Sequence, residues 1–377
     1  MTLAGHPGYR EIAEYYEHLI RTGHVQPGRK LPTEEELCGR YGVTRTTVRR
    51  AYAVLARKGL IVKRQGLGTF VAPESQVADH DRRRVVLAAP RTLADVSFPD
   101  FLLSGLWSYH YYQHLEAVIS ALARYARPFE VRYFTAEGEG LHEIGERASS
   151  RERAGILALA INNRESVDRL TSMGVPVVFL DSASFGREID LVRADNRDTV
   201  REATRHVLRH TDGPLAFIGS RKSVSEGSPH HERYLGFGDA HRELGRTVRE
   251  DLFVTGPVTP EAGREAVAGL LERSPDLGGV VCSDDLLGFG VLQVLAERGI
   301  PVPDRVSVFG FGDGLHSRST VPSLSTVAMD LRTMGLRAVE LLEERILNPH
   351  DRPRVVTVPC RVCYRQSTAP VLPERTR

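Results

Sequence analysis

The first forty residues show two short amphipathic patterns separated by a break. Apolar positions recur at helical spacing over residues 9–21, and Gly23 ends that pattern. The segment LPTEEEL then places Thr33 before a second helix, with Glu36 three residues later. A threonine followed at this spacing by glutamate is a capping box, so we expect a helix to begin here and to run to about Arg40.

A third pattern follows directly and completes a compact unit. Gly42 is suited to a tight turn, and Thr44 is expected to cap a helix that ends near Lys58. The run LIVKRQGLGTFVA contains two β-rich stretches around two glycines, which predicts a hairpin over residues 60–72. Helix, helix, turn, helix and hairpin is the order of a winged helix-turn-helix.

The remainder of the chain alternates buried β-type runs with helical patterns. This alternation predicts parallel sheets with helices on both faces, and about 290 residues suffice for two such lobes. Ligands of such folds bind at the carboxyl ends of the strands, here in a cleft between the lobes. The expected strands span 85–90, 129–135, 155–160, 175–181, 214–220, 278–283 and 306–312.

A polar stretch without periodicity separates the two parts. We therefore expect a winged helix-turn-helix domain over residues 1–73, a linker over 74–84, a two-lobe domain over 85–370 and a tail over 371–377.

Charge distribution distinguishes the two parts further. Residues 40–64 hold eight Arg or Lys and no Asp or Glu, although the whole chain carries 50 basic and 48 acidic residues. Such a run is commonly a solvated basic helix face, but it also suits a surface that contacts a polyanion. Residues 1–75 carry a net charge of +5, whereas the rest of the chain is mildly acidic. This asymmetry favours a nucleic-acid-binding N-terminal part.

Three motifs in the N-terminal part, LPTEEEL, YGVTRTTVRRA and GLIVKRQGLGTFV, resemble the GntR-type DNA-binding domain over residues 9–72. The family often has an arginine where this chain has Glu35. With the expected N-caps Thr33 and Thr44 included, the candidate DNA contacts implied by the resemblance are Thr33, Thr44, Arg45, Thr46, Thr47, Arg49, Gln65 and Gly66.

Residues 84–370 resemble LacI/GalR-type sensor domains, which are related to periplasmic sugar-binding proteins. The stretches that carry this resemblance include GVPVVFLD, ADNRDTVREATRHVL, ERYLGFGDAHRELG and the segment from GGVVCSDD to VFGFGD. The combination is that of arabinose-operon repressors of the AraR kind. It implies a winged helix followed by a two-lobe, periplasmic-binding-protein-like α/β domain with parallel sheets.

The same resemblance implies an effector site in the cleft. Arg233 is expected to donate to a sugar, Asp284 stands where the family usually has an asparagine, and Asp181 ends a strand that faces the cleft. The sugar-contacting aspartate of the family is replaced by Gly312, so a different arrangement of ligand is expected. In the aromatic-rich stretch 97–114, Phe98 and His110 are candidates for a ligand wall, although such rings equally fill a core or a subunit interface.

No metal, cofactor or catalytic site is expected. Cys360 and Cys363 form a single CxxC motif in a β-like run, and His206 and His210 lack a recognisable third ligand. Four cysteines, no signal peptide and no long apolar run suggest a cytoplasmic protein without a membrane segment.

The expected function is that of a non-enzymatic, ligand-responsive transcriptional regulator, more specifically a repressor of sugar-utilisation genes. It would bind a palindromic operator in double-stranded DNA as a homodimer. The alternative is a winged-helix regulator whose C-terminal domain binds a non-sugar effector or derives from an enzyme.

Overall fold

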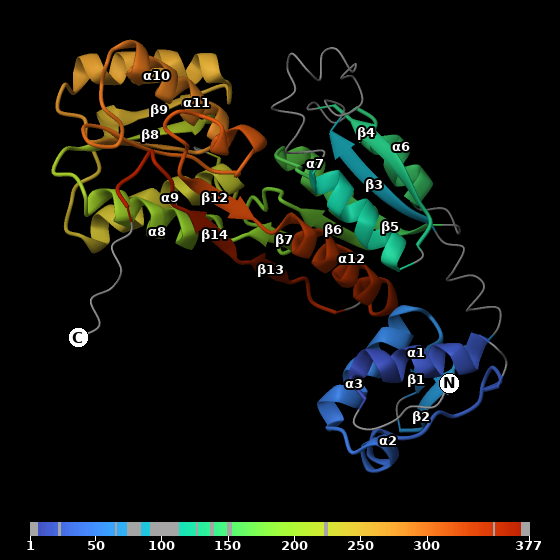
Figure 1. Ribbon diagram of the computed structural model, residues 1–377. Helices are drawn as coiled ribbons and strands as arrows, with labels where there is room; N and C mark the ends of the chain where they lie inside the picture. Colours follow the sequence, from blue (N-terminus) through green and yellow to red (C-terminus); the bar gives the residue numbers. More distant parts are fainter. Residues whose placement is uncertain are drawn as a thin grey trace.

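The computed structural model has three parts, a small N-terminal unit and two α/β lobes (Figure 1). It describes residues 7–21, 24–64, 66–73, 84–90, 113–125, 127–135, 139–148, 153–221, 225–349 and 351–370.

The N-terminal unit is a winged helix, as the sequence predicts. The capping box is confirmed, because Thr33 Oγ1 accepts from the backbone of Glu36 at 3.2 Å while the Glu36 carboxylate accepts from Thr33 N at 2.7 Å. Gly42 ends the second helix at φ 64°, a left-handed conformation that glycine adopts without strain. The elements are α1 (Tyr9–Arg21), α2 (Glu34–Tyr41), α3 (Arg45–Arg57), β1 (Ile61–Arg64) and β2 (Gly68–Val71).

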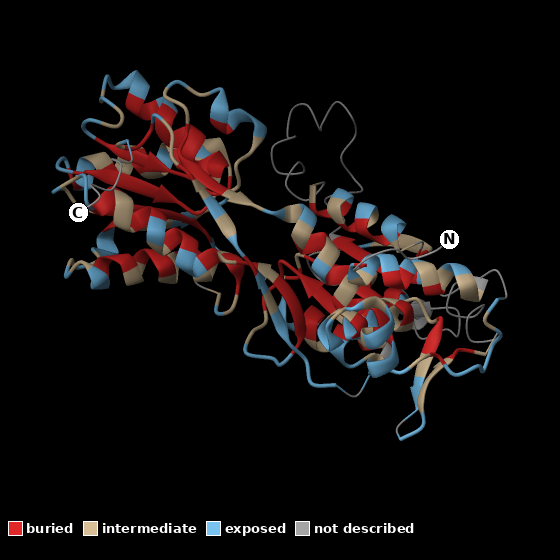
Figure 2. Cartoon of the chain, turned by 60° about the horizontal axis from the view of Figure 1, so that its bottom comes forward, coloured by how far each residue is buried: buried red, intermediate tan, exposed pale blue. Residues whose placement is uncertain are grey.

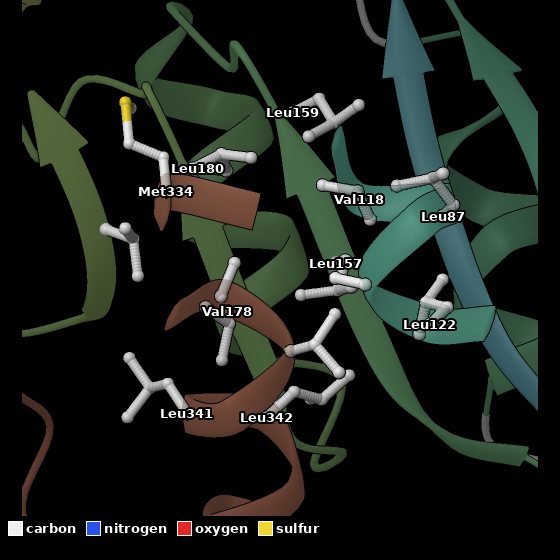
Figure 3. Close-up of a cluster of buried hydrophobic side chains, with 14 of the residues drawn as sticks. Leu87, Val118, Leu122, Leu157, Leu159, Val178, Leu180, Met334, Leu341 and Leu342 are labelled. Carbon is white, nitrogen blue, oxygen red and sulfur yellow. The ribbon is translucent and has the colours of Figure 1, made fainter. Parts of the chain in front are cut away.

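Lobe 1 is built on a six-stranded parallel sheet in the order β13-β7-β6-β5-β3-β4. One face is covered by α12 and by a helix over residues 113–124, whose apolar side chains form the core in Figure 3, and the other by α6 and α7. The elements are β3 (Arg84–Pro90), β4 (Phe129–Phe134), α6 (Leu141–Ala148), β5 (Arg153–Leu159), α7 (Arg164–Thr171), β6 (Val177–Leu180), β7 (Asp190–Ala194), α12 (Leu331–Leu347) and β13 (Val355–Val358).

Lobe 2 repeats this plan with a four-stranded parallel sheet in the order β11-β10-β8-β9. Helices α10 and α11 cover one face and α8 and α9 the other, so that both sheets are buried between helices whose outer sides are exposed (Figure 2). The elements are α8 (Asn196–Leu208), β8 (Leu215–Ser220), α9 (Pro229–Glu243), η3 (Glu250–Leu252), β9 (Phe253–Gly256), α10 (Pro260–Arg273), β10 (Gly279–Cys282), α11 (Asp285–Glu297), β11 (Ser307–Phe309) and η4 (Leu315–Arg318).

The lobes are joined where β7 leads into α8, where β12 (Thr326–Met329) leads into α12, and where β13 leads into β14 (Cys360–Cys363). Strands β12 and β14 pair antiparallel. The expected parallel sheets are confirmed in both lobes, and this antiparallel pair lies outside them, because the chain crosses between the lobes in opposite directions along the two strands. Strands β7, β9, β12 and β13 were not expected, since they are short and carry polar residues.

Glycines allow the covering helices of lobe 2 to cross closely. A Cβ at Gly236 of α9 would lie 2.2 Å from the carbonyl oxygen of Arg197 in α8. On the other face, a Cβ at Gly290 of α11 would lie 1.9 Å from the carbonyl oxygen of Pro260 in α10. Since a backbone oxygen cannot swing aside as a side chain does, each helix pair depends on a glycine at the crossing.

None of the helices described has the length and the apolar character that crossing a bilayer requires.

Two alanine substitutions in α9 test the glycine crossing. Gly236→Ala pushes α9 away from α8, and we expect it to lower the free energy of unfolding by about 1–3 kcal/mol or more. Gly238→Ala in the same helix meets open space, so its higher helix propensity is expected to stabilise the protein by about 0.5–1 kcal/mol. Chemical denaturation of the two purified variants measures both effects, and equal stability of the variants would contradict the prediction.

Candidate DNA-binding surface and interlobe site

The N-terminal end of α3 presents polar and basic side chains to solvent. Arg45 and Arg49 are 63% and 67% exposed, and Thr46 is exposed beside them. Val48 and Leu55 lie on the opposite side of the helix and are buried in the core of the winged helix. The alternation of apolar and basic residues along α3 therefore separates a packing face from a solvent face.

The first turn of α3 is held by threonine side chains. Thr44 Oγ1 accepts from the Thr47 backbone at 3.2 Å and lies 2.9 Å from Thr47 Oγ1. The same threonines line a surface groove of about 470 Å³ that extends to the start of α1, together with Pro7, Gly8, Tyr9, Gly42, Val43, Thr46 and Arg50. Thus Thr44, Thr46 and Thr47 are gathered at one surface, whereas the hydroxyl of Thr33 caps α2.

Acidic residues of α2 reach the arginines of α3. Arg49 Nε donates to Glu34 Oε2 at 2.8 Å, and Arg45 Nη2 lies 3.6 Å from Glu35 Oε2. Residues 40–64 contain no acidic residue, but in the folded protein two of their arginines form ion pairs with glutamates of α2. Exposed ion pairs of this kind contribute little to stability, so phosphates can replace the carboxylates at small cost.

The hairpin of β1 and β2, which is the wing, has a glycine at a position where the backbone conformation favours glycine. Gly66 has φ 74°, and a Cβ there would meet no atom within 4 Å, so the left-handed backbone and not a lack of space favours glycine. Leu67 beside it is exposed. Gln65 lies outside the described residues.

Arg233 is the centre of the candidate effector site. It is on α9 and is 3% exposed; its Nε donates to Asn196 Oδ1 at 2.8 Å, and its Nη1 donates to the carbonyl oxygen of Ser283 at 2.7 Å. The guanidinium carbon lies 3.5 Å from the centroid of the Phe311 ring. These contacts hold a charged, flat group at the ends of β10 and β11 and beside the crossing from β7 to α8.

The charge of Arg233 is balanced from both lobes. Burial lowers the pKa of its guanidinium, and nearby negative or acidic groups oppose this shift. In order of effect they are Asp181 of lobe 1, Asp284 of lobe 2, Cys360 of β14 and Asp285. The predicted residues Arg233, Asp181 and Asp284 are therefore brought close enough to interact electrostatically.

Asp181 lies at the carboxyl end of β6 in an unusual conformation. Its φ is 49°, its backbone N–H donates to Val192 O at 2.9 Å, and its carboxylate lies 3.6 Å from His114 Nε2. A left-handed conformation at a non-glycine residue is uncommon and concentrates at functional sites. Ala160, at the end of the neighbouring strand β5, has a φ of 50°.

Asp284 caps α11 and stands beside a polar cluster. Its Oδ1 accepts from the backbone of Leu286 at 3.0 Å. The preceding Ser283 Oγ accepts from Ser220 N at 3.0 Å and lies 3.3 Å from His230 Nδ1. His230 belongs to the first turn of α9. Phe98 and His110 lie outside the described residues.

The residues around Gly312 form structural contacts. Asp313, which follows Gly312 and has φ 50°, pairs with Arg365 and lies 3.5 Å from Arg318 Nη2. Its carboxylate is therefore held by Arg365, which follows β14, and by Arg318 of η4.

Sequence reasoning did not single out four contributors to this site, Asn196, Ser283, Phe311 and His114. Asn196 and Ser283 stand within quoted motifs, but residue type alone does not show that they hold the arginine. His114 is the last residue of the aromatic-rich stretch and approaches Asp181 only through the packing of the helix over residues 113–124.

The histidine and cysteine pairs have structural surroundings. His206 Nε2 lies 2.8 Å from Ala369 O and its ring packs on Tyr364, which ties the C-terminal segment to α8. Cys360 and Cys363 are separate thiols on β14. Within the described ranges, no group of three or more His, Cys, Asp or Glu side chains is arranged to hold a metal ion.

Asp285 is buried at the start of α11. Its carboxylate accepts from Ser317 Oγ at 2.7 Å and from Gly314 N at 3.0 Å, and Thr326 Oγ1 donates to its other oxygen. Burial nevertheless raises its pKa to about 6. These contacts join α11 to η4 and β12, the segment that leads to the crossing into lobe 1.

The replacement Asp285→Asn tests this arrangement through pH. Because the pKa of Asp285 is higher in the folded state, its contribution to stability is greatest below about pH 4 and falls as the pH rises to about 6. We expect the free energy of unfolding of the wild type, relative to the variant, to fall by about 3 kcal/mol over this interval and to remain level above it. Urea denaturation between pH 4 and pH 7 measures the difference, and a pH-independent difference would exclude the titration of Asp285.

Two family models match the chain. Residues 8–71 match the bacterial regulatory proteins of the gntR family, and residues 204–368 match the periplasmic binding protein-like domain. The GalR regulator of Lacticaseibacillus casei is 28% identical over 218 residues, which cover 57% of this chain and 66% of that protein. The GalR regulator of Escherichia coli K12 is 32% identical over 156 residues, 41% of this chain and 45% of that protein. The chain therefore spans less than two thirds of the length of these curated relatives.

Solved structures agree with the fold. The transcriptional regulator CelR in complex with cellobiose is 24% identical with a TM-score of 0.64, covering 89% of this chain and all of that one. The repressor AscG of Escherichia coli is 22% identical with a TM-score of 0.60 over 76% of this chain and all of that one. Residues 8–71 thus match the gntR family of bacterial regulatory proteins, and the chain joins this helix-turn-helix domain to a periplasmic-binding-protein-like domain similar to that of LacI- and GalR-type regulators.

Proposed function

We propose that the protein is a ligand-responsive transcriptional regulator, a repressor that binds operator DNA through the winged helix. The observation that carries this proposal is the presence in one chain of an exposed basic end of α3 and of a buried arginine between two lobes. The first suits a polyanion, and the second suits a small polar ligand. In this proposal residues 1–73 bind DNA, 74–84 connect, and 85–370 sense the ligand and form a homodimer.

On DNA, the N-terminal end of α3 enters the major groove. Arg45 and Arg49 leave Glu35 and Glu34 for phosphates or guanine edges, and Thr44, Thr46 and Thr47 add short hydroxyl contacts. Gly66 and Gln65 bring the wing to the backbone. Two copies related by a two-fold axis then read the two halves of a palindrome.

The proposed effector is a sugar in the cleft between the lobes. The Nη2 of Arg233 has no hydrogen-bond partner among the described residues, so it is available to donate to a ring oxygen or a hydroxyl. The carboxylates of Asp181 and Asp284 can accept hydroxyl protons from opposite lobes. CelR, a structural neighbour, was solved with cellobiose, which supports a sugar as the class of ligand.

A non-sugar effector is the second candidate. It is favoured by Gly312, which supplies no carboxylate, and by the pairing of Asp313 with Arg365. In either case the effector changes DNA binding by as much as its affinities for the two conformations differ.

Arg49→Ala tests the DNA-binding surface. We expect it to weaken binding to a duplex that the wild type selects from a random-sequence pool by about 10- to 100-fold, and to reduce the salt dependence by about one phosphate contact. Fluorescence anisotropy at several salt concentrations measures both. Arg264→Ala is the control, because it removes a half-exposed arginine of lobe 2 that also pairs with a glutamate, and it should bind as the wild type does. Equal affinities of Arg49→Ala and Arg264→Ala for the duplex would show that DNA does not bind at the N-terminal end of α3.

Arg233→Lys tests the effector site, since lysine keeps the positive charge and loses the planar fork. We expect one member of a panel of pentoses, hexoses and short oligosaccharides to raise the melting temperature of the wild type, and this shift to vanish in the variant. Arg242→Ala, at the exposed end of the same helix, should keep the shift. If sugar raises the melting temperature of Arg233→Lys as much as that of the wild type, Arg233 does not contact the ligand. If no sugar raises the melting temperature of the wild type, the non-sugar effector is favoured.

A further inference from the structure

The recognition helix also contacts the sensor domain, at the end opposite to its DNA-reading end. Helix α3 ends at Arg57 and packs against α12 of lobe 1 (Figure 1). Arg57 Nη1 lies 3.7 Å from Glu344 Oε1, and the Arg57 side chain is 14% exposed. An arginine at the end of an exposed helix is normally solvated, so its burial marks a real contact between the two parts of the chain.

The surface that receives Arg57 is acidic. Glu340 and Glu344 are one helical turn apart on α12, and the hydroxyl of Tyr125 donates to Glu340 Oε1 at 3.3 Å. Burial, with Glu340 next in effect, raises the pKa of Tyr125 to about 12, and the charge of Arg57 acts against this rise. Arg57, Tyr125 and the two glutamates thus form one cluster, which we call the α12 seat.

The seat leaves the DNA-reading end of α3 accessible. Arg45 and Arg57 are the first and last residues of α3, and a rise of about 1.5 Å per residue separates them by roughly 18 Å. Arg45 and Arg49 remain exposed while Arg57 is held. The docked arrangement is therefore compatible with DNA binding.

Helix α12 is fixed firmly to the sheet of lobe 1. Arg127 Nη2 donates to Glu343 Oε2 at 2.7 Å, and Arg345 donates to both carboxylate oxygens of Asp190 at 2.7 and 2.8 Å. All four side chains are buried, and breaking a buried pair is costly. Any movement of lobe 1 must therefore carry α12 with it.

The same helix lies on the strands that lead to the candidate effector site. It contacts β6 and β7, and Asp181 and Asn196 follow the carboxyl ends of these strands. Helix α12 also begins directly after β12, which comes from lobe 2. It is thus in contact with α3, with the strands below the site and with a crossing between the lobes.

We propose that the α12 seat is the docking surface by which the sensor domain fixes the orientation of the winged helix, and that this contact sets the affinity for operator DNA. The inference rests on the proposed DNA-binding function. Docking removes orientational freedom of the winged helix before DNA arrives, so less entropy is lost on binding. Releasing the seat weakens operator binding without altering a residue that faces DNA.

The test uses charge reversal in the full-length protein. Glu344→Arg places a second positive charge at the seat beside Arg57, and Arg57→Glu places a third glutamate there beside Glu340 and Glu344. The double variant Arg57→Glu/Glu344→Arg restores an opposite pair at the wild-type net charge. Arg354→Ala is the matched control, because it removes the other partner of Glu344 and leaves Arg57 in place.

Two readouts are taken for each variant. Small-angle X-ray scattering measures the radius of gyration, which is expected to increase in both single variants and to return in the double variant. Anisotropy with a duplex selected by the wild type is expected to show about a threefold to tenfold weaker affinity in both single variants, with recovery in the double variant. For Glu344→Arg the weakening is decisive, because added positive charge alone would strengthen DNA binding.

Contrary outcomes are distinct. Unchanged or tighter DNA binding by Glu344→Arg, or no recovery in the double variant, overturns the role of the seat while leaving the proposed function intact. A wild-type protein that selects no DNA sequence overturns the proposed function itself. A radius of gyration equal in the wild type and both single variants excludes docking at Arg57 and Glu344.

Discussion

The guanidinium of Arg233 is a positive charge enclosed by protein, and groups of both lobes act on it. A buried charge is tolerated where hydrogen bonds and opposite charges replace water. Here the hydrogen bonds come from Asn196, which begins the helix after the first crossing, and from the backbone at Ser283. The compensating carboxylates come from lobe 1 and lobe 2. Carboxylates at the carboxyl ends of both sheets therefore act on one cation.

Charge pairs in this protein fall into two physical classes. The pairs Arg127–Glu343 and Arg345–Asp190 are buried and bind α12 to the sheet, so that they act as fixed joints. The pairs of Arg45 and Arg49 with the acids of α2 are exposed, and water screens them. The Arg57–Glu344 contact lies between these extremes. Rigid pairs thus occur within lobe 1, and exchangeable pairs occur where the protein would meet DNA.

The sequence by itself determined the local structure of the winged helix. Thr33 with Glu36 and Gly42 with Thr44 specify the ends of two helices through contacts within four residues, so no distant partner is required. The longer apolar runs that became β3, β5, β8 and β10 were also readable, since a strand buried on both faces is apolar throughout. Strand β12 was not predicted, and neither was its pairing with β14, because this pairing joins segments more than thirty residues apart and in opposite directions.

For the site, residue type and order were sufficient to point to Arg233, Asp181 and Asp284, but not to what holds them. Asn196, Ser283 and Phe311 lie far apart in the chain and meet at Arg233 only when lobe 2 is folded. The positive charge of residues 40–64 was likewise evident from the sequence. The ion pairs of this stretch with Glu34 and Glu35 form only because α2 packs on α3. Local hydrogen bonds and apolar periodicity are encoded within a few residues. Electrostatic neighbours are set by the tertiary structure, because charges interact through space irrespective of their separation along the chain.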